Sequence, residues 1–141
     1  MQKYQAVIIG GGPSGHSAAV RIAQLGGKVA LIERDFIGGI CTNWGCTPSK
    51  SMIESAKVAR TVAESKKYGV DIKDYSVDFA RVAARRDTVV RQTREFVTEL
   101  LQNNQVDIFQ GEGQLISPHK VVVKGGKLDA DGETMHRSEE R

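Results

Sequence analysis

A glycine-rich segment between two short apolar runs constrains the fold of this chain more than any other feature. Residues 5–9 form an apolar run that predicts a strand, GGGPSG follows at residues 10–15, and a helical apolar spacing runs from Ser14 to Leu25. Lys28–Glu33 predicts a second buried strand. Because two successive strands joined through a helix lie parallel, the opening of the chain predicts a Rossmann-like α/β fold.

The glycine segment fits the pattern G-x-G-x-x-G, and its place between a strand and a helix separates it from a chance match. In this pattern Gly10 permits a tight turn, Gly12 lets the backbone approach a pyrophosphate, and Gly15 lets the helix pack on the strand. Pro13 and Ser14 open the helix, whose unpaired amides attract phosphate. A glycine-rich turn without a ligand is the alternative.

Glu33 closes the second predicted strand, at about the distance of 20 residues that the dinucleotide fingerprint requires. An acid there accepts hydrogen bonds from a ribose diol and repels a 2′-phosphate. We include the neighbouring Arg34 among the candidate cofactor-binding residues. The alternative for Glu33 is an ordinary surface acid, and for Arg34 and Asp35 simple exposure to solvent.

The chain has two cysteines, Cys41 and Cys46. In an unbroken helix their Cα atoms would lie roughly 8 to 9 Å apart, whereas a disulfide needs about 7 Å or less. Gly45 supplies a break, and we expect a new helix with Thr47 as N-cap and Pro48 at its first position. A helix N-terminus lowers the pKa of a nearby thiol, which favours redox chemistry over a structural crosslink.

Two other interpretations of the cysteine pair stay open: half of a zinc site, or two ordinary buried thiols. Zinc needs four ligands, and the sequence shows neither a second cysteine pair nor clustered histidines. We therefore favour a redox-active disulfide and predict no metal site.

Composition narrows the function classes further. A length of 141 residues with 40% hydrophobic and 26% charged residues is typical of one globular domain. The net charge of +3 is too small to indicate a nucleic-acid partner, and we interpret the basic residues 81–94 as one solvated helix face. Residues 6–9 are too short for a signal sequence or a membrane span. With closely spaced cysteines, this favours a cytoplasmic protein.

The rest of the chain predicts two long helices, Ser49–Lys67 and Asp78–Asn103, followed by short strands near residues 107–109, 114–116 and 120–124. We expect residues 1–125 to form a parallel sheet with flanking helices plus a small β meander. Residues 126–141 form a polar tail, either disordered or a hairpin turning at Asp131-Gly132.

The residues 10–15, Glu33, Gly38-Gly39 and 41–50 together resemble the class I pyridine nucleotide-disulfide oxidoreductases, and most of all the dihydrolipoamide dehydrogenases. The resemblance extends to about Lys124. It implies that the glycine segment binds FAD rather than NAD. It also implies that Cys41 exchanges with a dithiol or disulfide substrate, while Cys46 lies against the flavin.

The same resemblance adds Gly39, Lys50 and Gly113 to the cofactor-binding residues: Lys50 near the flavin ring, and the Gly113 backbone beside the adenine end. A solvated lysine is the alternative for Lys50. Ile40 stands where the family commonly has threonine, so it offers no hydroxyl to an FAD phosphate. Three further positions carry residues where the family commonly has aliphatic ones: Thr42, Trp44 and Thr47.

Family members continue into an NAD(P) domain, a central domain and a dimerisation domain that supplies a catalytic His-Glu pair. We therefore expect a fragment or truncated relative, incomplete relative to the family, that does not itself bind NAD or NADP. Its expected partners are a dithiol or disulfide substrate and the missing domains or a second polypeptide, without nucleic acid or membrane. We also expect a homo-oligomer. The alternatives are a non-catalytic FAD-binding or interaction module, and an NAD-binding Rossmann domain with incidental cysteines.

Overall fold

The computed structural model describes residues 2–125 and the backbone of residues 134–137. The turn predicted at Asp131-Gly132 lies outside the described residues. The elements follow in this order: β1 (Lys3–Tyr4), β2 (Ala6–Ile9), α1 (Pro13–Gln24), β3 (Val29–Glu33), α2 (Gly39–Asn43), α3 (Cys46–Ala63), a 3-10 turn η1 (Ser65–Tyr68), α4 (Phe79–Asn103), β4 (Asp107–Gln110), β5 (Glu112–Ser117), β6 (Lys120–Lys124) and β7 (Thr134–Arg137).

The strands form two sheets. A parallel sheet has the order β2-β3-β4, with Leu31 of β3 opposite Ile8 on one side and Ile108 on the other. The second sheet has the order β1-β7-β6-β5, in which β5, β6 and β7 form an antiparallel meander and β1 pairs parallel with β7. The predicted fold class, a Rossmann-like α/β sheet with a small β meander, is confirmed.

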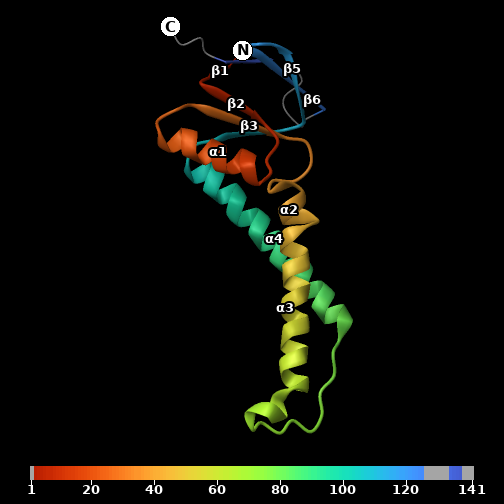
Figure 1. The fold of residues 1–141 in the computed structure, drawn as a ribbon. Coiled ribbons are helices and arrows are strands. Elements are labelled where there is room, and N and C mark those ends of the chain that lie inside the picture. The colour runs from red at the N-terminus through yellow and green to blue at the C-terminus, as the bar shows by residue number, and fades with distance from the viewer. Residues whose placement is uncertain (1, 126–133, 138–141) are drawn as a thin grey trace.

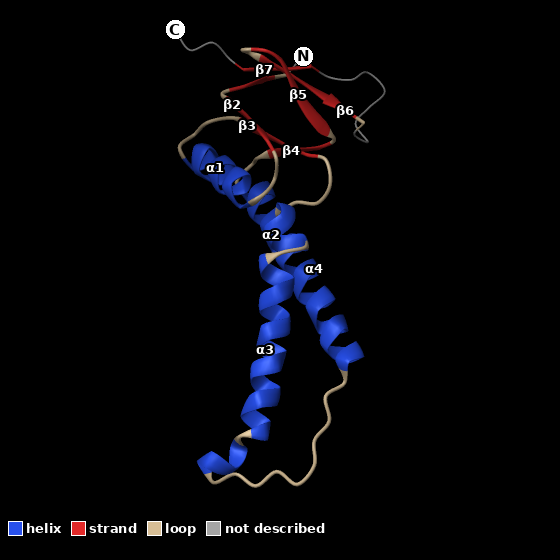
Figure 2. Ribbon diagram, turned by 45° about the vertical axis from the view of Figure 1, so that its right-hand side comes forward, coloured by secondary structure: helices blue, strands red, loops and turns tan. Residues whose placement is uncertain are grey.

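Strand β3 lies at the centre of the core because both of its faces are covered. Ala30 and Ile32 pack with a first cluster under the meander: Tyr4, Phe109 and Val121. Val29 and Leu31 pack with a second cluster on the helix side: Ala19, Val97, Leu101 and Val106. Figures 1 and 2 show α1 and the C-terminal part of α4 on one side of the parallel sheet and the meander on the other. A continuous apolar run is typical of such a doubly covered strand.

Helices α3 and α4 form a long hairpin that extends away from the sheets (Figures 1 and 2). The loop that joins the two helices ends at Asp78, whose carboxylate accepts a hydrogen bond from the Arg81 amide at 3.1 Å and caps α4. Helices α3 and α4 correspond to the two long helices predicted from the sequence. None of the helices in the described part of the chain is long and apolar enough to cross a membrane.

Three local predictions were inaccurate. The strand predicted over residues 5–9 begins at Ala6 rather than at Gln5. Strand β1, which joins the other sheet, and helix α2 were not predicted. The basic residues 81–94 do not form one solvated face. Arg85 donates to the Ser51 carbonyl at 3.1 Å and Arg94 donates to Asn43 at 2.9 Å, because α3 and α2 both contact α4.

Leu101 offers a test of this packing, because its side chain is fully buried between α4 and the parallel sheet. Leu101→Ala should lower the free energy of unfolding by about 2 to 5 kcal/mol. Leu25→Ala is the matched control, because Leu25 is 70% exposed, and it should change stability by less than about 0.5 kcal/mol. Urea denaturation measures both. Equal effects of the two variants would contradict this description of the core.

Candidate functional site

The glycine loop joins β2 to α1 as a tight turn with one open face. Gly10 has φ +104° and its amide donates to the Ile32 carbonyl at 2.7 Å. A Cβ atom on Gly15 would lie 1.9 Å from the Gly10 carbonyl oxygen, so only glycine fits. A Cβ atom on Gly12 would meet nothing within 4 Å. This open side, with the first amides of α1 beside it, fits a phosphate-bearing ligand.

A second loop lies against the glycine loop. The Gly38 amide donates to the Gly11 carbonyl at 2.8 Å. Gly39 has φ +58°, and a Cβ atom built on it would lie 2.8 Å from the Gly12 Cα. Gly39 is therefore required by close backbone contact, whereas a Cβ atom on Gly38, which has φ +96°, would lie 2.5 Å from the Thr42 side chain. The structure brings Gly39 to the glycine loop, as the cofactor-binding prediction requires.

Glu33 reaches the same loop through its carboxylate. Its Oε2 accepts a hydrogen bond from the Gly11 amide at 2.7 Å, and its Oε1 accepts one from the Asp35 amide at 2.9 Å. Arg34 differs, because its side chain is 69% exposed and pairs with Asp35 at 3.3 Å. The structure thus places Glu33 at the end of β3 beside the glycine loop and leaves Arg34 at the surface.

Gly113 of β5 lies at the carboxyl ends of two parallel strands. A Cβ atom there would lie 3.1 Å from Ile9, the last residue of β2, and 3.3 Å from Ile32 of β3. The absence of a side chain lets β5 pass close to the point at which the glycine loop begins. Ligands of open α/β sheets bind at this edge.

Cys41 and Cys46 form a disulfide, with their Cα atoms 4.6 Å apart. Cys41 lies within α2, and Cys46 is the first residue of α3. Trp44 and Gly45 separate the two helices, so the predicted break between the cysteines is confirmed. Cys46 lies at a helix N-terminus, which is the setting that the sequence predicted for the pair.

The start of α3 nevertheless differs from the prediction. Gly45, not Thr47, occupies the N-cap position, and no side chain caps the helix. Pro48 is the third helical residue rather than the first, and the exposed Lys50 lies in the second turn. The first-turn amides have no partner within a helix, so proline is tolerated at several positions there and does not define where the helix begins.

Asn43 was not singled out from the sequence, although it connects several parts of the site. Its side chain is buried, and its Nδ2 donates to the carbonyls of Ile37 and Gly39 at 3.1 and 2.9 Å. Its Oδ1 accepts a hydrogen bond from Arg94 Nε at 2.9 Å. In the sequence, only its position between the cysteines could have indicated a role for Asn43. Its partner Arg94 lies 51 residues away, so no local pattern predicts their contact.

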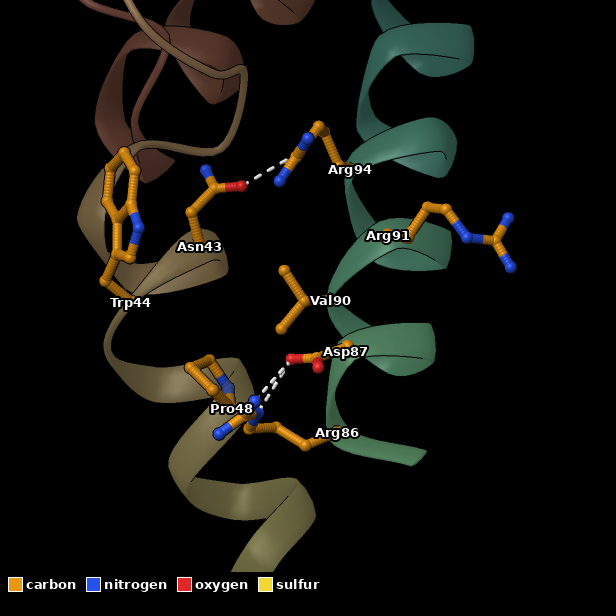
Figure 3. A pocket seen from close by; sticks show the side chains of 8 residues that line it. All are labelled: Asn43, Trp44, Pro48, Arg86, Asp87, Val90, Arg91 and Arg94. Atoms are coloured by element: carbon orange, nitrogen blue, oxygen red, sulfur yellow. Dashed lines mark hydrogen bonds and ion pairs between the residues drawn. The ribbon is translucent and has the colours of Figure 1, made fainter. Parts of the chain in front are cut away.

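A pocket of about 480 Å³ lies between the start of α3 and α4. Figure 3 shows Arg94 pointing toward Asn43, while Arg86 pairs with Asp87 at 2.7 Å beside Pro48. The lining residues are Asn43, Trp44, Pro48, Arg86, Asp87, Val90, Arg91 and Arg94. Trp44 is 59% exposed and its ring centroid lies 6.0 Å from that of Phe36. In the described part of the chain no three His, Cys, Asp or Glu side chains cluster as metal ligands.

Residues 4–132 match the sequence profile described as pyridine nucleotide-disulphide oxidoreductase. The chain belongs to this family. The predicted resemblance is therefore confirmed, and so is the oxidoreductase and flavoprotein character that it implied for the family. The roles of individual residues in the oxidoreductase site stay predictions.

Curated relatives carry the name dihydrolipoyl dehydrogenase. The protein of Acholeplasma laidlawii is 43% identical over 90% of this chain and 38% of its own length. That of Chlamydia muridarum is 39% identical over 88% of this chain and 27% of its own length. The chain thus spans well under half the length of these two relatives.

A solved structure shares the fold. The Cu(II) complex of the HOCl-induced flavoprotein disulfide reductase RclA from Escherichia coli superposes with a TM-score of 0.72 and 31% identity. The match covers 97% of this chain and 27% of that protein. The glycine loop and the cysteine turn therefore lie in a fold that flavoprotein disulfide reductases also use.

Gly15 and Gly12 make a matched pair for testing the oxidoreductase loop. Gly15→Ala should lower the free energy of unfolding by about 2 kcal/mol or more, because the clash with the Gly10 carbonyl outweighs the usual helical preference for alanine. Gly12→Ala should change stability by less than about 0.5 kcal/mol, because φ −68° and ψ −178° suit alanine and its Cβ meets open space. Denaturant unfolding distinguishes them, and the reverse order would contradict the loop geometry.

Proposed function

We propose that this chain carries the cofactor loop and the redox disulfide of an FAD-dependent dithiol/disulfide oxidoreductase of the dihydrolipoamide dehydrogenase type. The main support is the position of the Cys41–Cys46 disulfide. Cys41 follows Gly39 by two residues, and the Gly39 backbone lies against Gly12 of the glycine loop. A bond that can accept two electrons is thereby held close to a loop that suits a dinucleotide. Two cysteines without a redox role would have no reason to lie beside a dinucleotide-binding loop.

The chain offers a set of groups suited to FAD. The amides after Gly12 would hold the pyrophosphate, with Pro13, Ser14 and Gly15 forming the first turn of α1. Glu33 would accept hydrogen bonds from the ribose diol. Gly39 and Gly113 supply close backbone, and Lys50 is proposed to lie near the ring. When bound, the flavin supplies a two-electron acceptor for the reduced thiol pair.

The disulfide itself can exchange with a dithiol. A substrate thiolate attacks the Cys41 sulfur, the Cys41–Cys46 bond breaks, and Cys46 leaves as a thiolate at the N-terminus of α3, where the helix stabilises negative charge. The second substrate thiol then attacks the substrate sulfur of the mixed disulfide, and the bond from that sulfur to Cys41 breaks. The substrate leaves as a disulfide, and Cys41 takes up a proton and is left as a thiol. Two electrons and one proton pass from the substrate to the protein, and the second proton goes to the solvent because Cys46 stays a thiolate.

The roles of the two sulfurs, interchange with substrate and contact with the flavin, do not follow from their exposure. Cys41 is half-buried and Cys46 is exposed in this chain. The helix N-terminus favours Cys46 as the leaving thiolate, since the better leaving group is the thiol with the lower pKa. We therefore keep Cys41 as the interchange thiol and Cys46 as the thiol next to the flavin.

The proposal extends beyond this chain for the complete activity. Electron transfer to NAD or NADP, the remaining domains or a second polypeptide, and assembly as a homo-oligomer belong to the whole protein. A cytoplasmic location agrees with a disulfide that must be reduced in each cycle.

The visible absorption spectrum of the chain mixed with FAD tests the redox proposal directly. Bound flavin should develop a long-wavelength charge-transfer band when excess dihydrolipoamide is added, because a Cys46 thiolate then faces the ring. Cys46→Ser should abolish the band. Cys41→Ser should show it before any dithiol is added, because Cys46 can no longer form the disulfide.

Two results would contradict the redox proposal. Bound flavin with no band, and no difference between Cys46→Ser and the unaltered chain, would indicate a non-catalytic FAD-binding module. Binding of NAD without any binding of FAD would indicate an NAD-binding Rossmann domain with incidental cysteines.

Gly12→Ala tests the phosphate loop separately from the disulfide. Its Cβ would project into the open side of the loop, where the pyrophosphate is proposed to lie, so the Kd for FAD should rise about tenfold or more. Isothermal titration measures the change. Ser17→Ala, on the exposed side of α1, is the control and should leave the Kd unchanged. An unaltered Kd in Gly12→Ala would contradict this placement of the cofactor.

A further inference from the structure

Arg94 of helix α4 contacts the segment around the two cysteines. Arg94 Nε donates to Asn43 Oδ1 at 2.9 Å, and the guanidinium carbon lies 3.9 Å from the centroid of the Phe36 ring (Figure 3 shows the hydrogen bond). No carboxylate pairs with Arg94 among the residues that the structure describes. A neutral amide and an aromatic face are therefore its partners, and both belong to the segment around the cysteines.

Asn43 extends this link to the loop before the disulfide. Only 8% of Asn43 is exposed, and its amide nitrogen donates to the carbonyls of Ile37 and Gly39. Gly39 is the first residue of α2 and lies against Gly12. A series of contacts from Arg94 through Asn43 to Gly39 thus connects α4, the short helix α2 that contains Cys41, and the glycine loop.

We infer that Arg94 and Asn43 are positioning residues that keep Cys41 close to Cys46 after the disulfide has been reduced. The inference rests on the proposed function in one respect, namely that the pair cycles between disulfide and dithiol. In the oxidised chain the covalent bond itself holds the two Cα atoms 4.6 Å apart. After reduction, noncovalent contacts alone must do so.

Helix α2 needs such contacts because it is too short to be stable by itself. It has five residues, and isolated helices of that length do not persist in water. Trp44 and Gly45, which are outside both helices, join it to α3. Once the sulfur–sulfur bond is broken, the Arg94–Asn43 hydrogen bond fixes α2 to a long helix whose C-terminal part is buried in the core.

The consequence is a shift in the thiol–disulfide equilibrium. In a glutathione buffer, reduction breaks the Cys41–Cys46 bond, and two glutathione thiols give up two electrons and two protons and join as glutathione disulfide. When the Arg94–Asn43 contact holds α2 in place, the effective concentration of one protein thiol near the other is higher. This favours the protein disulfide over the dithiol. Since the disulfide and the Arg94–Asn43 contact order the same segment, each stabilises the other.

Arg91 provides a control on the same helix. It also lines the pocket, but its side chain pairs with Glu95 at 3.1 Å, is 60% exposed and points away from Asn43 in Figure 3. An effect that depends only on removing a positive charge from α4 should be equal at the two positions. An effect that depends on holding α2 should occur at Arg94 alone.

The experiment equilibrates the full chain, without flavin, in glutathione buffers of known ratio and counts free thiols by alkylation and mass spectrometry. Arg94→Ala should shift the equilibrium toward the dithiol by about tenfold, which raises the reduction potential by about 30 mV for a two-electron couple. Arg94→Lys should lie between Arg94→Ala and the unaltered chain, because an ammonium can donate to Asn43 but cannot stack flat on Phe36. Arg91→Ala should not change the equilibrium.

Equal equilibria in Arg94→Ala and Arg91→Ala would overturn the inference. If Arg94→Ala does not fold, Arg94→Lys and Arg91→Lys replace the pair, and equal equilibria in those two variants would overturn it as well. Because the measurement uses no flavin, the positioning role can fail while FAD binding is observed. It can also hold in a chain that fails the flavin test.

Discussion

Backbone segments approach each other so closely around the glycine loop that neither Gly15 nor Gly39 can carry a side chain. A Cβ on Gly39 would lie 2.8 Å from the Gly12 Cα, and one on Gly15 would lie 1.9 Å from the Gly10 carbonyl oxygen. These contacts fix the start of α1 against the end of β2 and fix the segment that leads into α2. The open side of the loop and the place of Cys41 both depend on them.

The disulfide lies where this constraint meets the helical hairpin. Cys41 belongs to α2, which the loop contact positions, and Cys46 belongs to α3, which packs along α4. The buried Asn43 satisfies loop carbonyls on one side and Arg94 on the other. A buried amide with several partners is costly to leave unsatisfied, so this network specifies one arrangement of the redox turn.

Much of the fold could be predicted because its signals are local. The apolar run of β3, the glycines before α1 and the helical spacing over α4 each indicate their element within a few residues. The boundaries were less predictable. Helix α3 begins at Cys46 rather than at Pro48, and α2 carries too little helical pattern in five residues to be recognised.

The sequence by itself determined the parallel sheet, the glycine loop and the family. It also determined that the two cysteines can form a disulfide only if the helix between them is broken. Each depends on residue types at short, fixed spacings, for which backbone geometry leaves few solutions. Only the tertiary structure decided that Glu33 reaches the Gly11 amide, and that Arg94 reaches Asn43. These partners are far apart in the chain, and they meet because the sheet register and the packing of α4 bring them together.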